Sequence, residues 1–208
     1  MLAGRMRTSA NAEWGLLFEA GTDNINVPAD ASIANIFDGG GFVEATIRVD
    51  GMGGGDFGRI YERGITDNFL FVTELSGSTC RLDFRFRFSN IAIWKSTDRV
   101  ITLGETHIIR LEYNASSTAN NPTMYVDNIS VGVTRETAPS GTRTSDATTA
   151  LVVGNREGLD RGFDGVISRF RCGAGASWLI NEGSGSTVYD NVSGNEGTIT
   201  GADWIRVK

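Results

Sequence analysis

The amino-acid sequence has few of the residues that cross-link or break a fold. Its 208 residues include two cysteines, three prolines and one histidine, and no glutamine. Cys80 and Cys172 lie far apart in the sequence and form no C-x-x-C pair, which argues against a secreted disulfide framework. We interpret both as small buried thiols. The sequence leaves open whether neighbouring strands bring them together.

Long apolar runs and an excess of basic residues are also missing. No segment approaches the roughly 20 apolar residues of a membrane span, and Met1–Ala10 lacks the apolar core of a secretory signal. The net charge is −6 and the pI is about 4.9, which disfavours contact with phosphates. We therefore expect no nucleic acid and no membrane among the partners. Unless a signal has been removed, the protein acts where it is made or is released by a route such as lysis.

Glycine and alternating short segments are abundant. The 27 glycines and 40% hydrophobic residues suit short strands that are joined by tight turns around a core. Leu82–Phe88 and Val43–Val49 alternate apolar with polar residues, which is the period of a half-buried antiparallel strand. The arginines of Arg81–Arg87 are expected on one solvated strand face. Other apolar runs predict strands at residues 16–18, 24–27, 59–61, 68–73, 90–94, 107–113, 123–126, 129–133, 150–153 and 165–170.

Turn signals separate these runs at the spacing of an all-β protein. Glycine clusters occupy residues 38–41 and 51–55, and Asp127-Asn128 predicts a tight hairpin turn because both residues tolerate positive φ. A dozen or so short strands predict a two-sheet antiparallel β-sandwich of the jelly-roll type. We expect an N-terminal arm at residues 1–13 and a single domain at 14–208. Its last part, 174–208, is predicted to be a docking segment, and residues 134–147 a soft polar loop.

Several segments carry a resemblance to a known family. Phe18–Pro28 is similar to an opening strand pair with an acidic-glycine turn, and Gly41–Val49 to the strand that follows it. Met124–Val131 is similar to a hairpin with Asn128 in the usual glycine position, and Leu151–Ile167 to the closing strands. On these segments the chain resembles laminin-G-like (concanavalin-A-like) jelly rolls, a resemblance that supports the fold more than a function.

The segment Trp178–Trp204 contains the most specific motif, Trp-x-x-x-Glu-Gly-Ser-Gly. In bacterial surface proteins of this family the motif usually precedes the jelly roll, whereas here it follows it. Because the first and last strands of a jelly roll are neighbours, the segment can dock from either end. The C-terminal placement resembles that of tail, fibre and decoration proteins of bacteriophages.

Catalytic patterns are weak. Glycan-cleaving enzymes of this fold carry Glu-x-Asp-x-Glu on one strand face, and the sequence has no such triplet; Glu44 and Asp50 stand six residues apart. His107 has no evident nucleophile partner, and a lyase site would need the glutamine that the chain lacks. We therefore expect a protein that is not an enzyme. The other strand carboxylates are interpreted as surface groups: Glu62, Glu74 and Glu112.

Metal and ligand sites have a few candidates. The resemblance implies a possible Ca²⁺, for which Asp23 and Asp164 are the candidate ligands; the alternative is that Asp23 forms an Asx turn and Asp164 caps a strand turn. For a glycan, Trp94 and Tyr61 are the candidate platforms, with Arg59 beside them. The alternative is that these aromatic rings pack in the core.

These observations favour a non-enzymatic phage virion protein, a capsid decoration or a tail or fibre component, with possible glycan binding. Its expected location is the virion, and its partners are other virion proteins and surface glycans, with homo-oligomers or particle-bound copies. The main alternative is a carbohydrate-binding module of a bacterial surface or secreted protein, located outside the cell. A glycan-cleaving enzyme is the minor alternative. The sequence does not distinguish capsid from tail, nor the symmetry of assembly.

Overall fold

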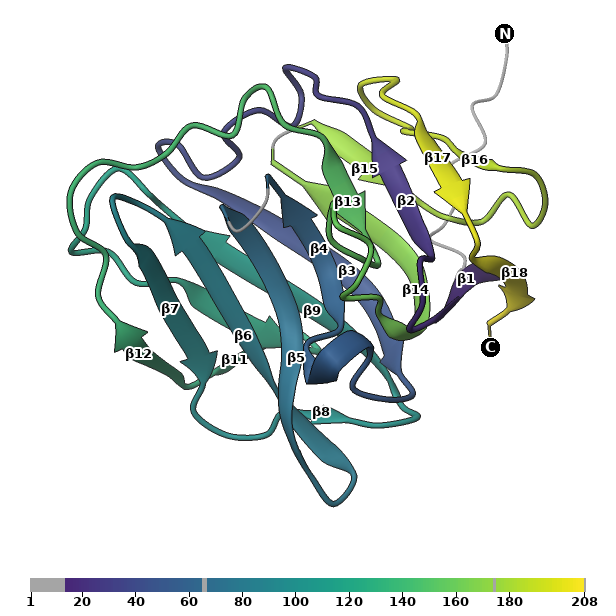
Figure 1. The fold of residues 1–208 in the computed structure, drawn as a ribbon, viewed down its shortest axis with the longest axis horizontal. Helices are drawn as coiled ribbons and strands as arrows, with labels where there is room; N and C mark the ends of the chain where they lie inside the picture. Colours follow the sequence, from purple (N-terminus) through teal and green to yellow (C-terminus); the bar gives the residue numbers. More distant parts are fainter. Residues whose placement is uncertain (1–13, 65–66, 174, 208) are drawn as a thin grey trace, which may run out of the picture.

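Two antiparallel sheets face each other in the protein (Figure 1). The structure is a computed structural model that describes residues 14–64, 67–173 and 175–207, so the predicted arm at residues 1–13 lies outside it. Sheet A has eight strands, in the order β11 (Ile129–Val131), β10 (Thr123–Val126), β9 (Thr106–Tyr113), β3 (Gly41–Val49), β14 (Asp164–Cys172), β1 (Trp14–Glu19) and β18 (Asp203–Arg206), with β15 (Ala176–Trp178) beside β14.

Sheet B has ten strands and faces the viewer in Figure 1. Their order is β12 (Val133–Thr137), β7 (Ile91–Ser96), β6 (Thr79–Arg87), β5 (Asn68–Ser76), β4 (Arg59–Arg63), β13 (Leu151–Val153), β2 (Asn24–Val27), β17 (Gly197–Thr200) and β16 (Thr187–Val188), with β8 (Ile101–Thr102) beside β6. Within the described part of the chain, the one helical element is the 3₁₀ turn η1 (Gly54–Asp56). This architecture confirms the predicted two-sheet β-sandwich.

Strand β6 shows why the pattern folds this way. Leu82, Phe84 and Phe86 are at most 2% exposed and pack in the core between the sheets. Asp83 faces the other way and is nevertheless fully buried, because Arg85 covers it with a hydrogen bond from Nε at 3.1 Å. Burial raises the pKa of Asp83, although Arg85 opposes the shift. The arginines of β6 do lie on the outer face of sheet B, as predicted, but they form ion pairs with Glu74, Asp83 and Asp67 that cover this face.

The hairpin between β10 and β11 forms where it is predicted. Asp127 and Asn128 have φ of 52° and 65°, as a tight two-residue turn requires. His107 supports this turn: its Nε2 accepts a hydrogen bond from the backbone N–H of Thr102 at 3.1 Å. The proton must then be on Nδ1, which donates to Asp127 Oδ2 at 2.8 Å. The single histidine has a structural role.

Strands of the C-terminal segment, residues 174–208, pair with strands of both sheets. β15 pairs with β14, β17 pairs with β2, and β18 pairs with β1, where Trp14 lies opposite Arg206. The first and last described strands are therefore neighbours, as predicted for a jelly roll. The turn after β16 is held by the Asp190 carboxylate, which accepts bonds from the backbone N–H of Ser177 at 2.9 Å and of Val192 at 3.0 Å.

The polar segment 134–147 is more ordered than predicted. Its first residues, 134–137, belong to strand β12. Near its other end, Asp146 is only 2% exposed. Arg63, fully buried, donates from Nη2 to the Asp146 carbonyl oxygen at 2.8 Å, and Asn68 donates to its carboxylate at 3.2 Å. Because a buried charge needs partners, these bonds tie the segment to β4 and β5.

Cys80 in sheet B and Cys172 in sheet A are free and buried, which confirms their interpretation as buried thiols. Burial raises the pKa of Cys80 to about 11 and that of Cys172 to about 12. No helix of the described residues is long and apolar enough to cross a membrane.

Candidate functional site

The predicted aromatic platform does not form. Trp94 is fully buried, with its ring stacked 5.7 Å from that of Phe84 and its Nε1 donating to Asn121 Oδ1 at 3.0 Å. Tyr61 is also fully buried, and its hydroxyl donates to Asn68 Oδ1 at 2.7 Å. A sugar ring cannot stack on a side chain whose faces are already covered by protein. The prediction of a ligand platform is wrong for both residues, and the alternative of core packing is confirmed.

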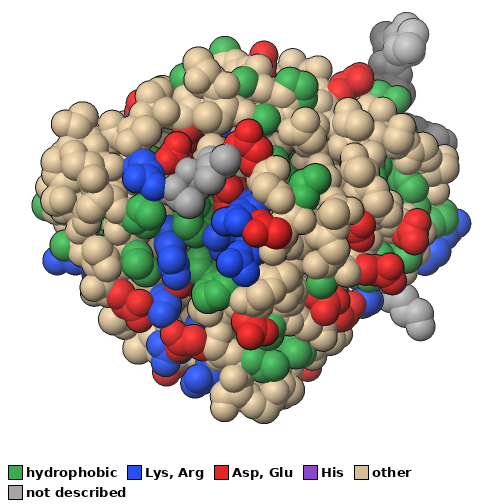
Figure 2. Space-filling model, in the orientation of Figure 1, with side chains coloured by type: hydrophobic (Ala, Val, Ile, Leu, Met, Phe, Trp, Pro, Cys, Tyr) green, Lys and Arg blue, Asp and Glu red, His purple; other side chains and the backbone are tan. Residues whose placement is uncertain are grey.

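Arg59 lies on the outer face of sheet B and is engaged by its neighbours. Its guanidinium carbon stands 4.1 Å from the ring centroid of Phe69 and 4.4 Å from that of Phe71, and Nε donates to Glu62 Oε2 at 3.0 Å. Burial lowers the pKa of Arg59, and the Glu62 carboxylate opposes this shift. Arg85 stacks beside it, 5.0 Å from the ring of Phe71. Figure 2 shows basic and hydrophobic side chains interleaved in this part of the face, over β5 and β6.

The predicted calcium ligands do not complete a coordination sphere. Asp23 Oδ2 accepts a hydrogen bond from the backbone N–H of Glu19 at 2.9 Å, and Asp164 pairs with Glu19 across β1 and β14. Burial raises the pKa of Asp164, and the charge of Asp50 adds to the shift. Ca²⁺ needs six to eight oxygen ligands, yet the described residues contain no group of three or more acidic, histidine or cysteine side chains that could hold one ion. These residues do not fit a calcium site.

A groove crosses the outer face of sheet B, beside the layer in which Arg59 and Arg85 stack on Phe69 and Phe71. It has a volume of about 480 Å³ and runs over β4, β13, β2 and β17. Its apolar surface comes from Ala150, Val152 and Leu159, and uncharged polar groups come from Asn26 and Thr198. The register explains this set, because Thr198 lies opposite Asn26 and Asn26 lies opposite Val152, which places all three in one row across the sheet.

The polar groups of the groove are free to meet a ligand. The side chains of Asn26, Thr198 and Thr200 are exposed, and none of them bonds to another side chain or to the backbone in the part of the chain that the structure describes. Leu159, 37% exposed, forms a wall at an unusual φ of 53°. Non-glycine residues adopt this conformation at a cost and are found preferentially at binding sites.

The carboxylates of this face are poorly placed for glycoside cleavage. Glu62 is 1% exposed and bound by Arg59. Asp83 is fully buried and lies on β6, two strands from Glu62 on β4. On the intervening strand β5, Glu62 lies opposite Phe69 and Asp83 lies opposite Phe71. Strand spacing and rise put the Cα positions of Glu62 and Asp83 about 12 Å apart. Both carboxylates are buried and held by arginines, Glu62 by Arg59 and Asp83 by Arg85.

Sequence reasoning missed the groove residues because β17 was assigned to a docking segment. The stretch Gly197-Thr-Ile-Thr200 does alternate, with Gly197 and Ile199 buried and both threonines exposed. That short period-two signal could have identified the strand. Its position beside β2 depends on pairing between distant segments, and the local sequence carries no signal for it.

Comparison with known proteins supports the fold. No family model and no curated protein sequence matches the chain. Among solved structures it is similar to the native heptameric SAP-like pentraxin from Limulus polyphemus, with a TM-score of 0.58 and 10% sequence identity, over 79% of this chain and 77% of the pentraxin. The pentraxin is a concanavalin-A-like jelly roll. At this identity the likeness concerns the fold alone, and it supports the two-sheet antiparallel jelly roll seen in this chain.

Proposed function

We propose that the protein is a non-catalytic binding protein whose ligand is an uncharged glycan held in the groove of sheet B. The observation that carries the proposal is the groove itself. It combines an apolar surface at Ala150, Val152 and Leu159 with unengaged amide and hydroxyl groups at Asn26 and Thr198. Sugars present apolar C–H faces beside hydroxyls that both donate and accept hydrogen bonds, so this mixture is complementary to them.

The charges around the groove favour an uncharged chain. Glu157 is exposed at its rim, and Glu62 lies in its floor. An acidic sugar entering the groove would approach both carboxylates. Two arginines near them, Arg59 and Arg156, are already bound to Glu62 and Asp160. Like charges brought together in a partly desolvated site cost free energy. The proposal therefore names neutral polysaccharides ahead of anionic ones.

The experiment is a calorimetric titration with a panel of neutral and acidic polysaccharides, with and without a chelator. Two neutral hydrogen bonds are worth about 1 kcal/mol each, so the double variant Asn26→Ala/Thr198→Ala is expected to bind about 30-fold more weakly. Ser130→Ala, an exposed serine on β11 of the other sheet, serves as the matched control and should bind like the native protein. Absence of binding across the panel, or equal affinity of the double variant, would refute the proposal.

The virion remains the proposed setting, and a specific observation favours docking to a larger particle. Leu179, Tyr189 and Val192 in the C-terminal segment are 38%, 50% and 64% exposed. Leu179 and Tyr189 adjoin the bridging pair Trp178 and Asp190, so two of these apolar groups lie on adjacent chain segments. Exposed apolar patches commonly mark protein contacts. Imaging of the protein in its native particle tests this setting, and an isolated monomer with no particle would count against it.

A further inference from the structure

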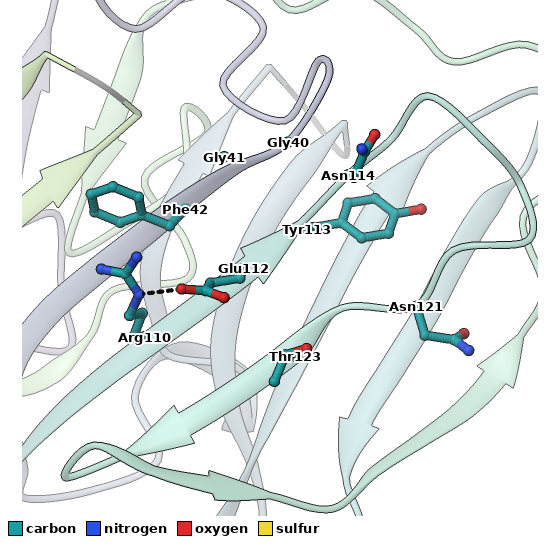
Figure 3. A pocket seen from close by; sticks show the side chains of 9 residues that line it. All are labelled: Gly40, Gly41, Phe42, Arg110, Glu112, Tyr113, Asn114, Asn121 and Thr123. Carbon is teal, nitrogen blue, oxygen red and sulfur yellow. Dashed lines mark hydrogen bonds and ion pairs between the residues drawn. The ribbon is translucent and has the colours of Figure 1, made fainter.

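A cavity of about 410 Å³ is lined by residues of β3, β9 and β10 in sheet A and of the loop between β9 and β10. Two charged residues of its lining bind each other, because Arg110 Nε donates to Glu112 at 2.7 Å (Figure 3). The side chains of Glu112, Asn114 and Asn121 point away from one another in Figure 3, so they offer no shared contact to a small ligand. The groove of sheet B differs, because several of its side chains lie in one row.

That row changes from polar to apolar across the sheet. Thr198 on β17 lies opposite Asn26 on β2, and Asn26 lies opposite Val152 on β13. All three residues line the groove, and the Cβ atoms of directly opposite residues are about 5 Å apart. A hydrogen-bonding group of a ligand at Asn26 therefore has an apolar side chain, Val152, as its immediate neighbour.

The apolar lining of the groove is aliphatic. It comes from Val152, from Ala150 two residues before it, and from Leu159 on the loop that follows β13. No aromatic residue is found among the described residues that line the groove. The flat face of a sugar ring is best matched by an aromatic ring, which is also flat. Aliphatic side chains form a rounded surface, which is better matched by a methyl group.

The loop that carries Leu159 is held in place by the protein itself. In this loop, residues 155–161, Asn155 is fully buried and its Oδ1 accepts the backbone N–H groups of Arg156 at 2.8 Å and Arg161 at 3.1 Å. Its Nδ2 donates to two carbonyl oxygens of the turn between β1 and β2, at 3.0 and 3.2 Å. The position of Leu159 is therefore set before a ligand arrives, which lowers the entropic cost of binding.

The fold alone does not explain a leucine at position 159. Its side chain is 37% exposed and lies outside the hydrophobic core. Its φ of 53° is in the left-handed region, which glycine and asparagine adopt more readily than leucine. The backbone would therefore favour glycine or asparagine here, and the leucine side chain is better explained by contact with a ligand.

These observations indicate which part of a ligand the groove recognises. We infer that the groove binds a methyl group of its glycan, and that Leu159 is the specificity-determining residue, which packs against this methyl group together with Ala150 and Val152. The inference rests on the proposed function. N-acetyl and 6-deoxy sugars both carry a methyl group beside hydrogen-bonding groups, and both are uncharged, as the carboxylates Glu62 and Glu157 in the groove favour.

The test compares neutral sugars in pairs that differ in a methyl-bearing group. Tri-N-acetylchitotriose is paired with cellotriose, and L-fucose with L-galactose. Calorimetric titration gives the affinities, and the NMR methyl signals of Leu159, assigned by their absence in Leu159→Asn, report contact. Burial of one methyl group should give at least one pair about a fourfold preference for the methyl-bearing sugar, and that sugar should shift the Leu159 signals. The pair that shows the preference identifies which of the two sugar classes is bound.

The variants separate the side chain from the backbone. Leu159→Asn removes the apolar group and keeps a residue that tolerates positive φ, so it should remain folded in thermal unfolding and lose the preference. Leu159→Gly should do the same. The matched control is Leu75→Asn, which changes a leucine that is 43% exposed on β5, outside the groove, and it should keep the preference.

Three results would overturn the inference: no binding of either methyl-bearing sugar up to about 20 mM, well above a Kd of about 1 mM; equal affinity within both pairs; or a preference that survives in Leu159→Asn. Equal affinity within the pairs, with weaker binding by Asn26→Ala/Thr198→Ala, would leave the proposed function standing and remove only this inference. Absence of binding by these sugars and by the polysaccharide panel would refute both.

Discussion

Replacing Trp178 by alanine is expected to remove a large part of the stability of the whole sandwich. The indole ring is 1% exposed, lies 6.1 Å from the ring of Phe170 in β14, and donates from Nε1 to the carbonyl oxygen of Asn195 at 2.9 Å. Burial of about 200 Å² of apolar ring surface at 25 cal/mol per Å² is worth about 5 kcal/mol. This is an upper value, because unfolded chains already bury some surface.

The expected loss is therefore about 3–5 kcal/mol, the range for tryptophan-to-alanine changes in cores, out of a total of about 5–15 kcal/mol for a domain. The assay is urea denaturation followed by fluorescence and by far-ultraviolet circular dichroism, with the slope of the transition compared between variants. Both probes should move together, because the segment that carries Trp178 pairs with strands of both sheets.

Two matched variants make this result specific. Trp178→Phe keeps an aromatic ring and removes the N–H, and should cost about 1–2 kcal/mol, mainly by leaving the Asn195 carbonyl unpaired. Val192→Ala changes a side chain of the same segment that is 64% exposed, and should cost less than about 0.5 kcal/mol. A loss below about 1 kcal/mol for Trp178→Ala would show that the segment is not part of the cooperative unit.

Three further predictions concern buried or turn residues. Cys80 and Cys172 should react with a thiol reagent at neutral pH only at the rate of unfolding, because burial raises both pKa values; fast labelling of the native protein would contradict their burial. Burial alone would raise the pKa of Glu44, but two bonds of 2.7 Å from Arg171 hold it below 4.5. Its contribution is present above the unfolded pKa and lost as pH falls, so Glu44→Gln should cost about 1.5–3 kcal/mol at pH 7 and progressively less below pH 4.5. A deficit that does not change with pH would refute this reasoning. Asn128→Ala should cost about 1 kcal/mol in thermal unfolding because of its positive φ, while Asn128→Gly should not.

Much of the fold could be predicted from period-two patterns, because a strand with one face in the core records that face in its own sequence. The strands β3 and β6 illustrate this, since their alternating residues are those that pack between the sheets. The C-terminal strands were missed because each is only two to four residues long, and because β17 and β18 pair with β2 and β1, which are distant in sequence.

The site was harder to predict, for a physical reason visible in β4. Arg59 and Tyr61 are two residues apart, a spacing that puts residues on one face of a regular strand, but the register shifts between them. Such a bulge turns one residue outward and the next expected neighbour inward, so Arg59 lies on the outer face and Tyr61 in the core. The prediction for Trp94 fails for another reason. Strand β7 has apolar residues on both faces, so its sequence does not show which face packs in the core.

The pairing of β1 with β18 also determines how the protein responds to force. Trp14 and Arg206 lie opposite each other, so the chain enters and leaves the sandwich at the same end of this strand pair. Tension between the two flanking segments would pull along the hydrogen bonds and load them one after another. The pair would open by peeling, at lower force than a pair loaded lengthwise, in which all bonds must break together. If the protein were attached to a surface through both flanking segments, the β1–β18 pair would be the first to separate under force.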